Sequence, residues 1–258
     1  MNAALSESLL PDANETLLMK VAETDMEIEQ AMRLRYQVFV KEEGNMKLAN
    51  DSRMEKDVFD EYCDHLIVKS SLTDKVVGTY RLLPGPRSAE GAGFYSETEF
   101  DLGALNLLRA DTLELGRSCI DPEYRNGRVI QMLWEGIAGY CQERGYSHLI
   151  GCASMHVGSL RDLNEIYSFL LWKKVITSRF GVSPLPTHRI DGLQWMEVEG
   201  REREIMRKLP PLLKGYQWLG AEIGGEPAYD EIFNSIDFLV ILDTGKVTRK
   251  YRKHFLEK

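Results

Sequence analysis

The stretch that decides the fold is Thr112–Tyr146, which reads TLELGRSCIDPEYRNGRVIQMLWEGIAGYCQERGY. Its first part, Thr112–Ile120, alternates small or apolar residues with polar ones, which predicts a strand. From Val129 the apolar residues recur at helical spacing until Gly145, a residue typical of a helix end. A strand that leads through a tight turn into a helix N-terminus leaves backbone N–H groups free. Those groups favour the binding of an anion.

The rest of the chain supplies strands and helices on either side of this unit. Upstream, the patterns predict a strand at 17–23, a helix at 26–42 and a hairpin of strands at 65–70 and 76–83. Downstream, they predict a strand at 148–155, helices at 161–175 and just after Pro210-Pro211, and a last strand at 236–242. A strand, a helix and a strand of these lengths form a right-handed crossover between parallel strands. The order predicts a mixed α/β (α+β) fold with a mostly antiparallel sheet.

Size and composition are those of an ordinary soluble protein. The chain has 258 residues, of which 43% are hydrophobic and 28% charged, and no run approaches the roughly 18 apolar residues of a spanning helix. The first residues lack the basic start and apolar core of a signal peptide, so we expect a cytoplasmic protein. We expect one domain over 1–258, with 1–15 loosely ordered.

Charge and metal-ligand patterns exclude some functions. The net charge of −8 argues against nucleic acid as a main partner. The five histidines lack metal-ligand spacing, so we expect no metal site, and the four cysteines lack a C-x-x-C pair, which favours reduced thiols. The tail Lys246–Lys258 holds six basic residues and one acidic residue. It is either a solvated terminal helix or a surface for peripheral contact with anionic lipid head groups.

Four motifs together resemble the GNAT acyltransferase superfamily. They are LRYQVFV at 34–40, FDEYCDHLIV at 59–68, VGTYRLL at 77–83 and LELGRSCIDPEYRNG at 113–127. More closely, they resemble the branch of acyl-homoserine-lactone synthases and of ornithine-lipid-type N-acyltransferases, often labelled hemolysin-like. The blocks PPLLKGYQWLGA, GGEPAYD and FLVILD, between 210 and 243, look like the C-terminal part of the ornithine-lipid-type enzymes.

This resemblance implies a fold, an activity and two substrates. The fold would be GNAT-like, with helices on both faces of the sheet and a family-specific C-terminal part at 200–258. The activity would be transfer of a long-chain acyl group, with or without a 3-hydroxyl, from acyl carrier protein to the α-amine of an amino acid, with ornithine the familiar acceptor. The product would be a lyso-aminolipid. Two alternatives stay open: an acyl-homoserine-lactone synthase that uses S-adenosylmethionine, and a non-catalytic GNAT-like binding module.

The turn before the long helix bears on the acyl donor. Acetyl-CoA-dependent members of the superfamily carry Gln/Arg-x-x-Gly-x-Gly/Ala here. Arg125 fits the first position, and Gly127 lies within the turn, but Arg128 and Ile130 stand where small residues are wanted. The resemblance therefore favours the acyl-phosphopantetheine of acyl carrier protein, which has no nucleotide to cradle, over CoA. Arg128 either crowds a pyrophosphate or turns outward to bind a phosphate. We expect no tightly bound cofactor.

Candidate catalytic residues lie on the strand at 112–120. Attack of an amine on a thioester needs a neutral amine, hence a base, and donors for the oxyanion of the tetrahedral intermediate. Glu114 is the candidate base or amine-positioning residue; the alternative is an ion pair with Arg81 or Arg117. Arg117 either closes the site by pairing with acidic loop residues or binds the carboxylate of the acceptor.

Further candidates for substrate binding come from the first three motifs. Buried arginines are costly without carboxylate partners, so these residues could equally form a structural ion-pair cluster. The cluster that the sequence suggests consists of Arg35, Arg81, Arg117, Asp60 and Asp64. Phe39 either lines the acyl or acceptor pocket or packs in the core.

Overall fold

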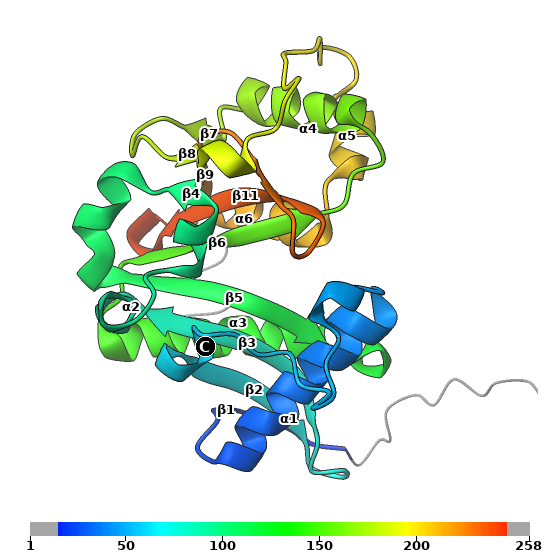
Figure 1. Cartoon of the computed structure of the whole chain (residues 1–258), viewed down its shortest axis with the longest axis vertical. Helices are drawn as coiled ribbons and strands as arrows, with labels where there is room; N and C mark the ends of the chain where they lie inside the picture. The colour runs from blue at the N-terminus through cyan, green and yellow to red at the C-terminus, as the bar shows by residue number, and fades with distance from the viewer. Residues whose placement is uncertain (1–14, 247–258) are drawn as a thin grey trace, which may run out of the picture.

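The computed structural model describes residues 15–246 (Figure 1). The main elements are β1 (Leu17–Val21), α1 (Asp25–Tyr36), β2 (Asp64–Ser70), β3 (Val76–Pro84), α2 (Gly85–Glu90), β4 (Phe100–Asp101), β5 (Thr112–Ile120), α3 (Arg128–Arg144), β6 (His148–Met155), α4 (Leu160–Trp172), β7 (Ile176–Thr177), β8 (Ser183–Pro184), α5 (Glu202–Lys208), α6 (Pro211–Leu219), β9 (Glu222–Gly224), β10 (Ala228–Asp230) and β11 (Ser235–Asp243). The strands of the large sheet follow the order β1-β2-β3-β5-β6-β11-β9-β7, with β10 beside β11.

The predicted mixed sheet and its central crossover are confirmed. The β5–β6 pair is parallel, as is the short β7–β9 pair, while the other pairs described in this sheet are antiparallel. Strands β5 and β6 have the bounds that the pattern predicted. The connecting helix α3 begins after Gly127 and ends at Gly145, and both glycines have the positive φ that suits such helix ends.

Helices cover both faces of the sheet, because successive strand residues point to opposite sides. Leu66 and Val68 of β2 pack with the α3 residues Leu133 and Ile137. The intervening Ile67 packs on the other face with α1. Figure 1 shows α1 and α3 on opposite sides of β2 and β3. The prediction of helices on both faces is therefore confirmed.

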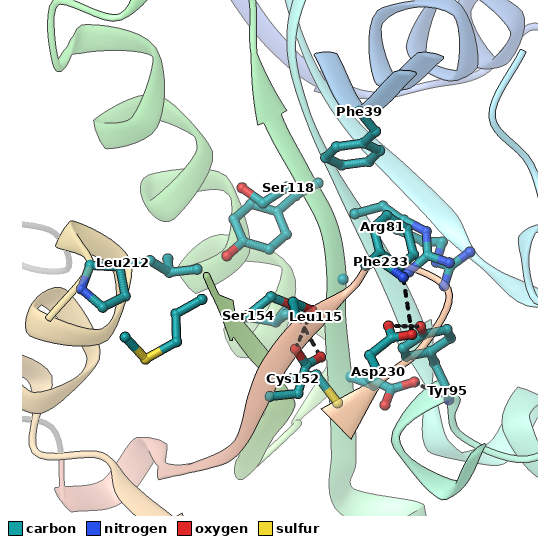
Figure 2. A pocket seen from close by; sticks show the side chains of 18 of the residues that line it. Phe39, Arg81, Tyr95, Leu115, Ser118, Cys152, Ser154, Leu212, Asp230 and Phe233 are labelled. Carbon is teal, nitrogen blue, oxygen red and sulfur yellow. Dashed lines mark hydrogen bonds between the residues drawn. The ribbon is translucent and has the colours of Figure 1, made fainter. Parts of the chain in front are cut away.

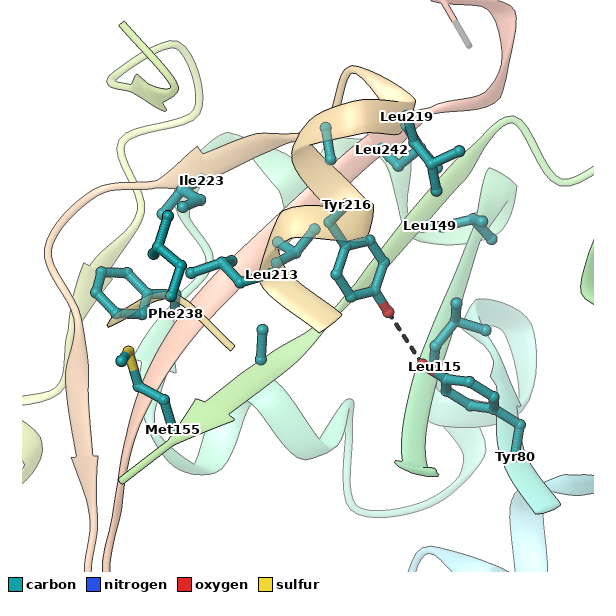
Figure 3. Close-up of a cluster of buried hydrophobic side chains, with 14 of the residues drawn as sticks. Tyr80, Leu115, Leu149, Met155, Leu213, Tyr216, Leu219, Ile223, Phe238 and Leu242 are labelled. Carbon is teal, nitrogen blue, oxygen red and sulfur yellow. Dashed lines mark hydrogen bonds between the residues drawn. The ribbon is translucent and has the colours of Figure 1, made fainter. Parts of the chain in front are cut away.

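The segment after residue 200 joins the same sheet. Strand β11 pairs with β6 along eight residues, and α6 packs on these strands through buried leucines (Figure 3). Figure 3 also shows Tyr216 of α6 reaching Tyr80 of β3, with 3.2 Å between the two hydroxyl oxygens. Helix α6 thus bridges from the C-terminal strands to the N-terminal half of the sheet. The short elements α5, β9 and β10 were not predicted.

The first helix differs from the prediction at its C-terminal end. It begins after the N-cap Thr24, whose side chain accepts the backbone N–H of Glu27. The α-helix stops at Tyr36, and Gln37–Glu42 continues as a π-helix, which repositions Phe39.

Some expectations concern residues that are not described. Residues 1–14 and 247–258, which include nearly all of the basic tail, lie outside the described range. Between residues 15 and 246, no helix combines the length and the apolar character needed to span a membrane. The cysteines are free thiols, as expected.

Candidate functional site

The centre of the site is the place where β5 and β6 separate. Their ladder covers only Thr112–Glu114 of β5, although both strands continue for several residues beyond it. Figure 1 shows the two strands diverging. We call this separation the strand opening. Backbone donors and acceptors on the edges that face it have no partner in the β5–β6 ladder, so they are available to a ligand.

A bulge and a glycine shape the strand opening. Between the pairs Thr79–Cys119 and Arg81–Gly116, β5 contains one residue more than β3, and Arg117 within this bulge has a φ of 50°. A bulge bends its strand, which explains why β5 turns away from β6. At the last point of contact, a Cβ on Gly151 would clash with the Leu115 carbonyl oxygen. Glycine therefore permits the close approach from which the strands diverge.

Two cavities meet at the strand opening. The first, about 370 Å³, is lined by polar and aromatic side chains that include Phe39, Glu114 and Arg117 (Figure 2). The second, about 670 Å³, lies between the end of β5, α3 and α6, and it is lined mainly by apolar residues such as Ile130 and Trp134. Both cavities are lined by Glu43, Ser118, Pro210 and Leu212, so they adjoin each other.

Glu114 is buried at the narrow end of the strand opening. Its carboxylate accepts the backbone N–H groups of Tyr95 (2.6 Å) and Ser96 (2.8 Å) and the Ser96 hydroxyl. The alternative of an ion pair is not supported, because neither Arg81 nor Arg117 lies in salt-bridge contact with it among the described residues. Burial raises the pKa of Glu114 despite these hydrogen bonds.

Three arginines and three carboxylates form what we call the buried-arginine network. Its members are Arg35, Arg81, Arg117, Glu55, Asp57 and Asp60. Glu55 bridges Arg35 and Arg117, and Asp57 bridges Arg81 and Arg117. The formal charges cancel, as buried ions require. The ion-pair interpretation of Arg35 and Asp60 thus fits the geometry, and Arg117 pairs with the acidic loop residues Glu55 and Asp57.

Arg81, Arg117 and Phe39 nevertheless also line the first cavity. The Arg117 guanidinium lies between the rings of Tyr95 and Phe233, 4.5 and 4.6 Å from their centroids. Phe39 meets Phe233 edge to face, with 5.6 Å between ring centroids. Phe39 is therefore both a packed core residue and part of the cavity wall, and its role toward a substrate stays a prediction.

Asp64 does not belong to this network, which corrects the cluster suggested by the sequence. Its carboxylate pairs with Arg87 at 2.8 and 3.0 Å and accepts the Tyr140 hydroxyl of α3 at 2.6 Å. Asp60 and Asp64 are four residues apart, and the 3₁₀ turn at Asp60–Tyr62 comes between them. That turn sends the two carboxylates to different partners. Asp64 does not line either cavity.

The turn before α3 places its three candidate residues at the surface. Arg125 forms a two-point ion pair with Glu42, so it holds the π-helical segment against the turn. Gly127 adopts a φ of 93°, and the backbone N–H of Arg128 bonds to the Asn126 side chain. Arg128 is exposed, and none of the ion pairs identified among residues 15–246 includes it. Its side chain therefore turns outward rather than crowding the backbone.

Three buried carboxylates near the first cavity were not predicted. Asp230 ends β10, Asp237 lies on β11, and Glu99 follows the 3₁₀ turn that contains Tyr95 and Ser96. A signal existed for Asp237, which is a charged residue inside an otherwise apolar strand. Glu99 and Asp230 occur in polar, loop-like sequence, so nothing local marked them as buried.

Comparisons with known proteins agree on one family. A family model described as "Acetyltransferase (GNAT) domain" matches residues 34–135. The chain is 34% identical over 251 residues to an L-ornithine N(alpha)-acyltransferase of Brucella abortus, covering 93% of this chain and 89% of that protein. It is 32% identical over 251 residues to the protein of the same name from Rhodobacter capsulatus, covering 93% and 95%.

Solved structures show the same fold at low sequence identity. A CoA-dependent acyl-homoserine lactone synthase, solved with SAM and isopentyl-CoA, matches with a TM-score of 0.56 and 16% identity, covering 94% of this chain and 89% of that one. An N-acyl amino acid synthase from uncultured soil microbes, FeeM, matches with a TM-score of 0.52 and 11% identity, covering 94% and 97%.

Proposed function

Because this chain belongs to the GNAT acyltransferase family that includes the L-ornithine N(alpha)-acyltransferases, we propose that it acylates the α-amine of ornithine. The donor is a long-chain acyl group, 3-hydroxylated or unsubstituted, carried on acyl carrier protein. The product is an N-acylornithine, a lyso-aminolipid. The observation that carries the proposal is the buried carboxylate of Glu114 at the narrow end of the strand opening. The whole chain serves as one acyltransferase domain.

The two adjoining cavities suit two substrates that meet at the strand opening. The apolar second cavity takes the acyl-phosphopantetheine arm, and the unpaired backbone edges of β5 and β6 offer hydrogen bonds to its amide groups and to the thioester. The polar first cavity takes the amino acid. Arg125 lines the second cavity, and Arg128 is exposed three residues after it. Arg128 would therefore meet the phosphate of the arm.

Glu114 would act as the base. One oxygen, Oε2, accepts a single described hydrogen bond, which leaves a lone pair for the amine or for a water molecule. Burial raises the pKa of Glu114, so its affinity for a proton is closer to that of an amine. The amine nitrogen attacks the thioester carbon as Glu114 accepts its proton. Backbone N–H groups at the strand opening stabilise the oxyanion.

The tetrahedral intermediate then collapses. The C–S bond breaks, the new amide remains on ornithine, and the thiolate of the phosphopantetheine takes up the released proton. The step is direct transfer, and no cysteine of the enzyme is acylated. Burial raises the pKa of Cys119, and also that of Cys152 in the first cavity, so both are poor nucleophiles.

The product suggests where the enzyme works. A lyso-aminolipid partitions into a bilayer, so we propose that the enzyme acts in the cytoplasm at the inner face of the membrane. The basic residues of 246–258 suit contact with anionic head groups, although most of this tail lies outside the described residues.

The test uses purified enzyme with acyl carrier protein charged with a long-chain acyl group, and with the matching acyl-CoA. L-Ornithine is the acceptor, S-adenosylmethionine is the alternative acceptor, and products are identified by mass spectrometry. We expect N-acylornithine from acyl carrier protein, and at least about 100-fold less from the Glu114→Ala variant. Acyl-homoserine lactone would identify a lactone synthase instead. Absence of any acylated product from folded enzyme would favour the binding module. Faster reaction with CoA would contradict the donor proposal alone.

A further inference from the structure

Resting on the proposed function, we infer that Glu99, Asp230 and Asp237 form a subsite for the side-chain ammonium group of a basic amino acid. We call these three residues the acidic subsite. They would select ornithine over a neutral amino acid of the same length. Glu114 acts on the α-amine, whereas the acidic subsite would hold the other nitrogen at the far end of the acceptor.

The fold brings the three carboxylates to one place from separate elements. Asp237 of β11 stands opposite Ser154 of β6, and Cys152, two residues earlier, lies on the same face of β6. An oxygen of Asp237, an oxygen of Glu99 and the Cys152 sulfur lie within 4.8 Å of one another. Figure 2 shows Cys152, Tyr95 and Asp230 at one end of the first cavity, well away from Leu212.

The three carboxylates are buried, and Glu99 is the one left without hydrogen bonds within residues 15–246, whereas Asp230 also accepts the backbone N–H groups of Ile232 and Phe233. Glu99 is 2% exposed, and both of its carboxylate oxygens lack a hydrogen-bond partner among the described residues. The neighbouring Tyr95 hydroxyl donates to Asp230 at 3.1 Å. Asp237 is 1% exposed and, within the described part of the chain, accepts hydrogen bonds from the hydroxyls of Ser154 and Ser235 alone. A buried carboxylate without donors is costly, and an ammonium group would bring three N–H donors.

The acidic subsite also lacks a cation of its own. Arg117, whose charge acts on Glu99 and Asp237, already pairs with Glu55 and Asp57 of the buried-arginine network. No salt bridge identified within residues 15–246 includes Glu99, Asp230 or Asp237. Burial, together with mutual repulsion, raises the pKa of both Glu99 and Asp237. In the free enzyme they would retain protons that a bound cation displaces.

The base and the subsite adjoin the same side chain, since the charges of Glu114, Glu99 and Asp237 all act on the Cys152 thiol. The Ser96 hydroxyl binds Glu114, and the Cys152 thiol contacts the same Ser96 oxygen at 3.7 Å. Cys152 therefore connects Ser96, which binds Glu114, with the acidic subsite. The two nitrogens of ornithine are joined through four carbons and span about 6 Å when extended. An α-amine at Glu114 would place the terminal ammonium group among the acidic residues.

A metal ion fits the same atoms less well. The group combines two carboxylates with one thiol and contains no histidine. Carboxylates suit hard metal ions, whereas a thiolate suits soft ones. Burial raises the pKa of the Cys152 thiol, which disfavours the thiolate that a metal would bind. An ammonium ion needs only acceptors, which the carboxylates supply.

The experiment compares L-ornithine with L-norvaline, which has the same carbon chain but no terminal amine. The enzymes are wild type, Asp237→Asn, Glu99→Gln and the control Glu231→Gln. Glu231 follows Asp230 directly, but its side chain is 83% exposed. For wild type, we expect kcat/KM for ornithine to exceed that for norvaline roughly 100-fold or more. In Asp237→Asn and Glu99→Gln this ratio should fall at least about tenfold, with the norvaline rate kept. The control should retain the ratio.

Binding of both amino acids is also measured by calorimetry, with and without a chelator. Ratios that stay unchanged in both variants, with ornithine acylated normally, would overturn the subsite and leave the proposed function intact. Loss of the ornithine preference on chelation would assign the cluster to a metal and overturn the ammonium assignment. A wild-type enzyme that acylates neither amino acid would refute the proposed function. Selective ornithine binding that depends on Asp237 would still support the subsite in that event.

Discussion

The Arg35 guanidinium holds the Asp60 carboxylate in a two-point fork, with N–O distances of 2.7 and 2.9 Å. The third nitrogen position of Arg35, Nε, donates to Glu55 at 2.5 Å. Both members of the fork are buried, and Arg35 is fully enclosed. Although burial opposes ionisation, the hydrogen bonds and charge of Arg35 lower the pKa of Asp60. Arg35 thus connects α1 to the acidic loop and is not available to a substrate.

Replacing Arg35 with methionine should therefore destabilise the fold strongly. The Arg35→Met variant leaves Asp60 and Glu55 buried without their partner, and such losses cost roughly 3–5 kcal/mol of unfolding free energy. Urea denaturation measures the change. The control Arg33→Met removes a half-exposed arginine from the same helix and should alter stability by less than about 1 kcal/mol. Equal effects of the two variants would contradict a structural role for the network.

Glu114→Gln should lower kcat with little change in the KM for the acyl donor. Removing a general base costs roughly 10²- to 10⁴-fold in rate. Because the deprotonated carboxylate is the active form, wild-type activity should rise with pH through the Glu114 pKa, which burial raises above its usual value. The variant should lose this rise, which is the acid limb of the pH profile.

Steady-state rates across the pH range test this prediction, and thermal melting verifies that the variant is folded. A matched replacement, Glu123→Gln, changes an exposed carboxylate and should leave the pH profile as it is. A Glu114→Gln enzyme that retained the acid limb would assign it to another group.

The fold could be read from the sequence wherever local pattern and tertiary burial agree. The strands at 112–120 and 148–155 have the predicted bounds, because most of their residues are buried; the first stops at Asp121-Pro122 and the second lies between Gly145 and Gly158. The site was predictable where charged residues interrupt such strands, as at Glu114 and Arg117. The partners were not predictable, because Glu55 and Asp57 come from a loop whose path depends on the arginines that it meets. For the same reason, Asp64 was placed with the wrong arginines.

Gly151→Ala should weaken both stability and activity. The added methyl group would press on the Leu115 carbonyl at the point where β5 and β6 diverge, and the backbone there cannot yield as a side chain can. Clashes of this kind cost about 1–3 kcal/mol. Gly139→Ala in α3 is the matched control, since its new methyl group meets nothing within 4 Å. That variant should gain about 0.5–1 kcal/mol because alanine favours a helix. Urea denaturation and acyl transfer rates distinguish the two.

Glu99→Gln should stabilise the protein relative to wild type, and the gain in unfolding free energy should be larger at alkaline pH than at acid pH. The pKa of Glu99 is raised to about 10 by burial and by the nearby Asp237 and Asp230. Between its unfolded pKa and this value, the unfolded chain releases the proton and the folded chain keeps it, so wild-type stability falls as pH rises. Glutamine removes that dependence.

Thermal melting at pH 5 and pH 8.5, without substrate, measures the difference. A gain of about 1 kcal/mol corresponds to roughly 2–4 °C for a chain of this size. The exposed Glu231→Gln should show no such trend. If the Tm difference between Glu99→Gln and wild type is the same at both pH values, Glu99 is not protonated in the folded state.

The order of the strands brings two distant parts of the gene to one site. Glu99, Glu114 and the turn before α3 lie inside the stretch 34–135. Asp230 and Asp237 instead belong to the β10–β11 hairpin, far downstream in the chain, which reaches the site only because β11 inserts beside β6. If the proposed acidic subsite holds, mutations in that hairpin alter the choice of amino acid without touching Glu114. A transfer of acceptor specificity between relatives then needs residues 228–243 together with position 99.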